Sequence, residues 1–171
     1  MASKLIIFIC ILFFHVNSEE LNSWSQLVKK GNTYFKKSDD LPFTGTLKNH
    51  FPSGEISIID HIKEGKQHGE FKSFHRNGNI AMIGKFNNGK QTGEWSEFYD
   101  DGSLYWRLLY IDGVKHDGLF QMFHKNGKVK SEVIYKNDKP FSNWVYFDEK
   151  GDKERIDIYK DGKFFYEKYL K

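Results

Sequence analysis

Cysteine is almost absent from this sequence: its 171 residues include one, Cys10. A chain with one cysteine forms no internal disulfide, so we expect a fold held together by packing and hydrogen bonds. Long hydrophobic runs are also missing. The apolar run at residues 5–14 has ten residues, whereas a helix that crosses a membrane needs about 20.

A strong excess of one charge is missing as well. The chain has 26 Lys and Arg against 23 Asp and Glu, and both signs are interspersed along it. Proteins that bind nucleic acid usually concentrate basic residues on one surface. We therefore expect no nucleic acid partner.

Residues 1–18 have the composition of a secretory signal peptide. Lys4 gives a positive start, the apolar run 5–14 follows, and Val16 and Ser18 stand at the minus-three and minus-one positions of a cleavage site. We predict export to the periplasm or the medium after cleavage near Ser18; retention as an uncleaved anchor is the alternative. Ile9 is too large to precede a lipid-modified cysteine, which disfavours a lipoprotein. Loss of Lys4 leaves 25 basic against 23 acidic side chains, a net charge of about +2.

Motifs of common enzyme classes are missing too. Beyond residue 18 there is no thiol nucleophile, no G-x-S-x-G elbow, no phosphate-binding loop and no H-E-x-x-H metal helix. The acidic pairs Asp39-Asp40 and Asp100-Asp101 lie in predicted loops, where Asp accepts hydrogen bonds from nearby backbone N–H groups. We predict that the protein is not an enzyme and uses no cofactor.

What the sequence does contain is a repeat. Residues 69–116 hold two copies of one pattern, GEFKSFHRNGNIAMIGKFNNGKQT and GEWSEFYDDGSLYWRLLYIDGVKH, spaced 24 residues apart. Self-similarity at a fixed period is typical of repeat architectures. The glycines of this pattern recur over five repeats, and Asp138 and Ser142 replace two of them. They are Gly45, Gly54, Gly65, Gly69, Gly78, Gly89, Gly93, Gly102, Gly113, Gly118, Gly127, Gly151 and Gly162.

The segments between these glycines predict β-strands. They are rich in aromatic and β-branched residues, and no segment is long enough for the usual helix of about 10 to 14 residues. Asn-Gly and Asp-Gly pairs favour hairpin turns with positive φ at both central positions. Such pairs are Asn77-Gly78, Asn88-Gly89, Asp101-Gly102, Asp112-Gly113, Asn126-Gly127 and Asp161-Gly162.

We therefore predict an all-β fold, an elongated antiparallel meander of β-hairpins with about five 24-residue repeats. Because strands lie ~4.8 Å apart, five repeats give a ribbon on the order of 50 Å long without a single central core. The repeats occupy residues 43–162. Residues 163–171 are predicted to form a capping strand, which protects the sheet end.

The lead-in segment at residues 19–42 has two interpretations. Residues 19–30 place Leu21, Trp24, Leu27 and Val28 on one side of a possible short helix that stops at Gly31. Alternatively, residues 26–30 and 33–37 form a hairpin around Gly31. We favour the hairpin.

Aromatic residues occur two and five positions after the residues that open four of the repeats, Gly69, Gly93, Gly118 and Ser142. Strict alternation along a strand sends these two positions to opposite faces of the sheet, unless a bulge brings them together. We favour one crowded face of the +2 residues, with the +5 residues against adjacent turns or on the other face; each buried ring adds ~1.5 to 3 kcal/mol. The +2 residues are Phe71, Trp95, Phe120 and Trp144, and the +5 residues are Phe74, Phe98, Phe123 and Phe147.

The segments GEFKSFHRNG, GEWSEFYDDG and GLFQMFHKNG, each followed by a strand and a second turn, resemble the MORN-type repeat in its bacterial variant form. Residues 27–45 (LVKKGNTYFKKSDDLPFTG) are similar to the entry segment of many exported bacterial members. The resemblance implies a curved or twisted single sheet of hairpins. Relatives with the parent repeat act as scaffolds, dimerisation modules or membrane-lipid contacts, and some members have an antitoxin-like label. Asp138 and Ser142 depart from the pattern, so the last repeat is expected to differ in geometry.

The histidines give no indication of a metal site. His75 and His124 occupy equivalent positions two repeats apart, a separation of ~20 Å, whereas the ligands of one ion converge on it within a few ångströms. We expect no bound metal. The six histidines beyond residue 18 are His50, His61, His68, His75, His116 and His124.

The best candidate for a ligand surface is an aromatic series. Rings repeated at ~10 Å along a sheet could stack against successive sugars or line a groove for an extended peptide. The simpler interpretation is a buried seam, and exposure of Trp106 or Tyr110 in a row distinguishes the two. The series is Trp95, Tyr99, Tyr105, Trp106, Tyr110 and Trp144.

Three functions follow. The first is a non-catalytic exported scaffold or binding module for a protein, through an edge strand or the concave face. The second is an envelope binder of glycan or membrane lipid headgroups, which requires an exposed aromatic row or a one-sided cluster such as Lys72, Lys85 and Lys90. The third is an antitoxin-like protein, which conflicts with export. The sequence does not determine the oligomeric state.

Overall fold

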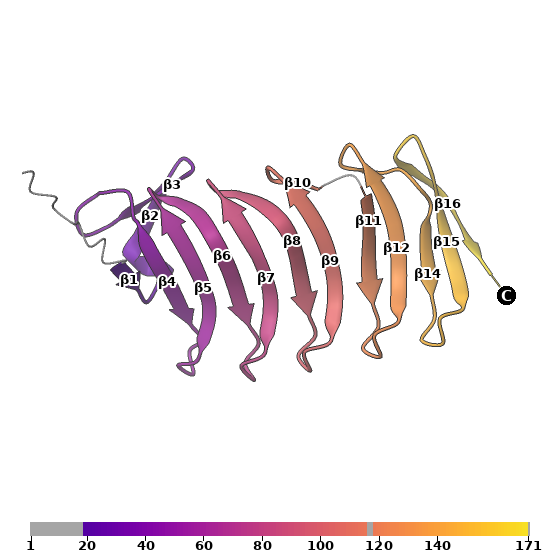
Figure 1. The fold of residues 1–171 in the computed structure, drawn as a ribbon, viewed down its shortest axis with the longest axis horizontal. Coiled ribbons are helices and arrows are strands. Elements are labelled where there is room, and N and C mark those ends of the chain that lie inside the picture. Colours follow the sequence, from indigo (N-terminus) through magenta and orange to yellow (C-terminus); the bar gives the residue numbers. More distant parts are fainter. Residues whose placement is uncertain (1–18, 116–117, 171) are drawn as a thin grey trace, which may run out of the picture.

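The computed structural model describes residues 19–115 and 118–170, which form a long row of strands (Figure 1). The signal peptide predicted at residues 1–18 and His116 lie outside the described residues. The strands are β1 Glu19–Leu21, β2 Leu27–Lys30, β3 Thr33–Lys36, β4 Gly45–His50, β5 Ile56–Lys63, β6 Lys66–Phe74, β7 Ile80–Asn87, β8 Lys90–Phe98, β9 Leu104–Ile111, β10 Val114–Lys115, β11 Gly118–Phe123, β12 Val129–Lys136, β13 Lys139–Pro140, β14 Trp144–Phe147, β15 Lys153–Lys160 and β16 Lys163–Tyr169.

One sheet contains nearly all of these strands. Its order from β4 to β16 follows the chain through five hairpins, β4–β5, β6–β7, β8–β9, β11–β12 and β14–β15, while β1 pairs with β4 in parallel and β2–β3 form a separate small sheet. The short strands β10 and β13 pair antiparallel with the ends of β9 and β12, across tight turns. This arrangement confirms the predicted all-β elongated hairpin meander.

The turns between repeats are tight two-residue turns along one edge of the sheet, the upper edge in Figure 1. Both central residues have positive φ in each of them, as type I′ hairpin turns require. The pairs are Glu64-Gly65, Asn88-Gly89, Asp112-Gly113, Asn137-Asp138 and Asp161-Gly162. Asp138 therefore adopts the backbone conformation of the glycine that it replaces.

The turns within repeats, along the opposite edge, differ from the prediction. We expected type I′ turns at Asn77-Gly78, Asp101-Gly102 and Asn126-Gly127, but only the glycine of each pair has positive φ. In each loop the Asn or Asp side chain accepts a hydrogen bond from a backbone N–H two residues later, at 3.0, 2.9 and 3.0 Å. This local bond favours a wider five-residue loop, because it satisfies the backbone without a tight turn.

The break at Ser142 also alters the ladder. The Ser142 hydroxyl accepts a hydrogen bond from Ile134 N at 2.9 Å, and Phe141 N donates to Ile134 O at 2.7 Å. The strand that should follow the turn is thus divided into β13 and β14, with Phe141 outside the ladder. The predicted departure of the last repeat lies here.

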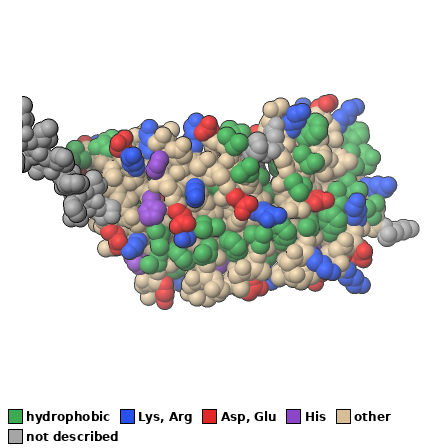
Figure 2. Space-filling model, in the orientation of Figure 1, with side chains coloured by type: hydrophobic (Ala, Val, Ile, Leu, Met, Phe, Trp, Pro, Cys, Tyr) green, Lys and Arg blue, Asp and Glu red, His purple; other side chains and the backbone are tan. Residues whose placement is uncertain are grey.

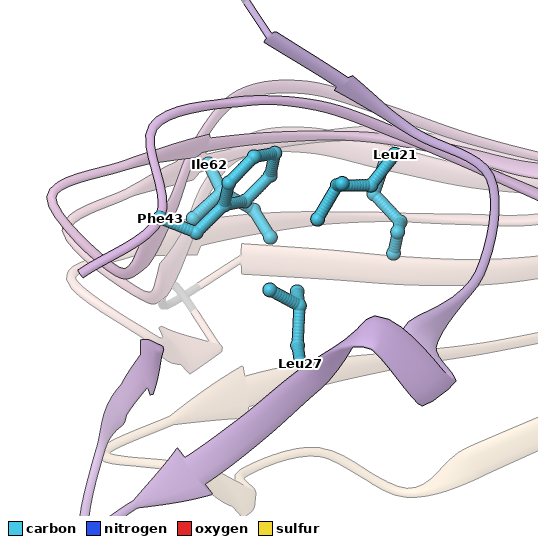
Figure 3. Packing of buried hydrophobic residues seen from close by; sticks show 5 residues of the cluster. Leu21, Leu27, Phe43 and Ile62 are labelled. Carbon is cyan, nitrogen blue, oxygen red and sulfur yellow. The ribbon is translucent and has the colours of Figure 1, made fainter. Parts of the chain in front are cut away.

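The lead-in forms the favoured hairpin, β2–β3, around Gly31, and its only helical element in the described part is a single 3-10 turn, Trp24–Gln26. It folds over the first repeat and closes a hydrophobic cluster (Figure 3). The cluster comprises Leu21, Leu27, Phe43, Leu47 and Ile62, with Trp24 and Tyr34 packed against it.

The +2 aromatic residues lie on one face and form a seam. Phe71 and Trp95 are 5.5 Å apart between ring centroids, and Phe120 and Trp144 are 5.8 Å apart. The +5 residues directly follow a break in register in each repeat, such as the one between Ser73 and Phe74. The extra residue lies on the partner strand, so a β-bulge in the partner falls between the two aromatic positions.

Candidate functional site

The described part of the chain contains no group of three or more His, Cys, Asp or Glu side chains arranged to hold a metal ion. Among the described residues, no helix has the length and apolar character needed to cross a membrane.

Trp95 lies inside the aromatic seam, with 2% of its surface exposed. Its ring contacts Phe86 at 5.0 Å and Tyr110 at 6.3 Å, and its indole N–H donates to Lys85 O at 3.2 Å. A residue that is packed on all sides in this way stabilises the sheet and leaves almost no ring surface for a ligand.

The other five members of the predicted aromatic series are half-buried. Tyr99 and Tyr105 contact each other at 5.0 Å between centroids, whereas Trp106 contacts Phe120 at 6.3 Å and donates its indole N–H to Glu97. Trp144 contacts the same Phe120 from the next repeat. Each of these rings packs against a neighbouring ring, and none of them is mainly exposed.

Apart from Phe141, the mainly exposed aromatic rings of the described residues lie instead on β16, at the C-terminal end of the sheet. Phe164, Phe165, Tyr166 and Tyr169 are 56%, 66%, 50% and 63% exposed. Within the described chain β16 pairs only with β15, so its outer edge is open. The strand predicted at residues 163–171 is present as β16, and its aromatic rings are exposed.

A side-chain ladder runs along the loop edge of the sheet. Tyr99 donates its hydroxyl hydrogen to Phe123 O at 3.0 Å, which joins one repeat to the next. His75 Nε2 lies 2.9 Å from Phe98 O, and His124 Nε2 lies 2.9 Å from Phe147 O; because a carbonyl only accepts, each Nε2 is the donor. His75, Tyr99 and His124 therefore link repeats, and their shared position explains why His and Tyr replace one another.

Charged side chains of both signs are interspersed over the face shown in Figure 2, beside a strip of hydrophobic side chains along the long axis. Of the lysines considered as a one-sided cluster, Lys72 forms an ion pair with Glu70 at 2.7 Å, and Lys85 lies opposite the same glutamate in the ladder. Lys90 is at the edge of the sheet, in a different environment. A carboxylate, Glu70, thus accompanies Lys72 and Lys85.

Asp60 is a buried carboxyl group in the N-terminal half of the sheet, with 0% of its surface exposed. Burial raises the pKa of Asp60 to about 6, although Gln67 Nε2, which donates to its Oδ2 at 2.6 Å, opposes the shift. Its Oδ1 has no hydrogen-bond partner in the described part of the chain. Asp60 is thus a titratable group inside the seam, and sequence analysis did not identify it.

Comparison with known proteins gives one family match. The model described as the MORN repeat variant matches residues 67–88, 91–112 and 117–137. No curated protein matches the chain. A solved structure titled "Crystal structure of accessory secretory protein 1,2 and 3 in Streptococcus pneumoniae" has 14% sequence identity and a TM-score of 0.21; the similarity covers 88% of this chain and 21% of that chain.

Proposed function

We propose that the chain, three of whose repeats match the MORN repeat variant, acts outside the cytoplasm as a non-catalytic binding module whose edge strand β16 pairs with an extended segment of a partner protein. The observation that supports this function is the open edge of β16 together with its exposed aromatic rings.

The chemistry of an edge strand favours a protein segment. A free edge offers backbone N–H and C=O groups at the spacing of a β-strand, and an added strand satisfies them while its side chains meet those of the edge. Burial of an exposed ring such as Phe165 against the segment adds ~1.5 to 3 kcal/mol. A glycan-binding row would need the rings of the central repeats, and those rings pack against one another.

Export is part of the proposal. Residues 1–18 support it by composition, and a partner in the periplasm or outside the cell follows from it. β16 is the longer of the two terminal strands, with seven residues against three in β1, which fits a scaffold that holds a partner at its C-terminal end.

The test uses the full chain with a photo-crosslinking amino acid at Phe165 and, separately, at the apolar Ile111, which is 50% exposed against 66% for Phe165. Envelope extracts are irradiated, and the crosslinked peptides are identified by mass spectrometry. We expect a peptide from one partner that crosslinks at Phe165, protects β16 from hydrogen exchange and is lost in the variant Tyr166→Pro. Crosslinks to a second copy of this chain instead indicate self-association, and equal crosslinking from Ile111 contradicts a specific edge.

A further inference from the structure

A hollow at the N-terminal end of the sheet collects three lysines from three different elements. Lys29 comes from β2, Lys66 is the first residue of β6 and Lys90 is the first residue of β8. We call it the entry hollow; its volume is about 340 Å³. Its other lining residues are Asn32, Tyr34, Gln67, Asn88 and Gly89. It lies at the opposite end of the chain of strands from β16.

The positive charge of the entry hollow is not neutralised by the protein. No acidic side chain lines it. Within residues 19–115 and 118–170, none of the three lysines has an ion-pair partner; Lys29 Nζ lies 5.2 Å from the centre of the Tyr34 ring, which attracts a cation weakly. By contrast, Lys30, next to Lys29, pairs with Asp40 at 2.5 Å.

The fold accounts for this convergence. Lys66 and Lys90 occupy equivalent positions in successive repeats, just after the type I′ turns, so their strands are ~10 Å apart. The turns are held in place because Gly89 N donates to Gln67 O at 2.8 Å. The lead-in hairpin then adds Lys29, since Tyr34 N donates to Gly65 O at 2.7 Å and ties β3 to the adjacent turn.

The equivalent edge at the other end of the sheet differs in charge. There Lys136, Lys139 and the turn residue Asp161 line a hollow, so a carboxylate accompanies the lysines. The lead-in hairpin has no counterpart at that position. The uncompensated charge is therefore specific to the entry hollow, and Lys139 serves as a matched control for Lys66 and Lys90.

We propose that the entry hollow binds a small phosphate-bearing anion. Three ammonium groups can approach a tetrahedral phosphate from different directions, and Lys binds phosphate as a point charge without demanding one fixed geometry. The amide side chains of Asn32 and Asn88 can donate to the remaining oxygens. A volume of about 340 Å³ admits a phosphate monoester or a diphosphate.

A neighbouring hollow limits the approach from one side. Lys63, Glu64, Lys66, His68 and Asn88 line it, so Lys66 and Asn88 belong to both. Glu64 is exposed and repels an anion that approaches Lys66. Its removal should therefore strengthen binding, which is a change opposite in sign to the loss of a lysine.

Binding of inorganic pyrophosphate is measured by isothermal titration calorimetry at low and at moderate salt. We expect affinity that falls with salt, because the lysines are exposed. The triple variant Lys29→Gln, Lys66→Gln, Lys90→Gln should bind at least tenfold more weakly, Glu64→Gln more tightly, and Lys139→Gln like the wild type. Urea unfolding confirms that each variant folds; exposed Lys to Gln changes leave the packed seam intact.

A second arm identifies the source of the phosphate. Vesicles of phosphatidylcholine with and without phosphatidylglycerol are sedimented with each variant. Pyrophosphate binding without vesicle binding assigns the hollow to a soluble ligand, and vesicle binding that the triple variant abolishes assigns it to a lipid headgroup. The proposal is overturned if neither probe binds, or if Lys139→Gln weakens binding as much as the triple variant does.

Discussion

Gly84 leaves the space in which the indole of Trp95 lies. A Cβ atom added at Gly84 would stand 2.2 Å from the Trp95 ring, far inside van der Waals contact. Gly84 is also the glycine whose φ is not positive, so its role is steric and differs from that of the turn glycines. We expect Gly84→Ala to destabilise the protein by about 1 to 3 kcal/mol through overpacking, measured by urea unfolding.

Trp95 provides the control for that interpretation. Trp95→Ala should cost about 3 to 5 kcal/mol as a cavity mutation. In the double variant with both Gly84→Ala and Trp95→Ala, the methyl group added at position 84 meets no indole. The loss of stability should therefore be smaller than the sum of the two single losses. Strict additivity in the cycle would show that Gly84→Ala acts through something other than this contact.

The glycine period was sufficient to predict the meander, because each turn needs a conformation that few residues adopt. All thirteen glycines of the period have positive φ, but the prediction that all of them lie in turns was wrong, because the structure places four in strands: Gly45, Gly69, Gly93 and Gly118. The period could not reveal Gly84, since a strand glycine that accommodates a ring looks like any other small residue. It also could not assign turn type at Asn77, where a side-chain bond decides the loop, or the entry hollow, which requires the lead-in to fold back on the repeats.

Asp138 tests the requirement for positive φ in the turn between repeats that contains no glycine. Its φ is +59°, beside +51° at Asn137, in a type I′ turn. Asp138→Gly should stabilise the protein by about 0.5 to 1 kcal/mol, because glycine adopts this conformation without steric cost. Thermal unfolding measures the change. Gly89→Asp, which introduces the same residue pair in an earlier repeat, should have the opposite sign; a loss of stability in Asp138→Gly would contradict the argument.

Tyr99 tests the side-chain ladder on the loop edge. Tyr99→Phe removes the hydroxyl that donates to Phe123 O, and a lost hydrogen bond of this kind costs about 0.5 to 1.5 kcal/mol. Faster hydrogen exchange should appear in the loop after Phe123. Tyr105→Phe is the matched control: its ring contacts Tyr99, but its hydroxyl has no hydrogen-bond partner in the described part of the chain. Equal effects from both variants would assign the loss to ring packing.

Asp60 gives the protein a pH dependence of defined sign. Burial raises the pKa of Asp60 in the folded protein to about 6 from 3.8, so the folded state binds the proton more tightly than the unfolded state. The resulting stabilisation is complete below pH 3.8, and it is lost as the pH rises through about 6. By linkage the loss amounts to about 2 to 3 kcal/mol.

Asp60→Asn should therefore remove this decline, because an amide keeps an acceptor for Gln67 and has no charge to bury. We expect the variant to be more stable than the wild type at pH 7.5 and to differ little from it at pH 4, as measured by urea unfolding at both values. Asp100→Asn is the control of opposite sign. The hydrogen bond with Lys125 lowers the pKa of the exposed Asp100 carboxyl. The small stabilisation that this bond gives the folded protein is therefore present at neutral pH and disappears in acid. If Asp60→Asn leaves the pH profile of the wild type unchanged, Asp60 is not the group that titrates in the seam.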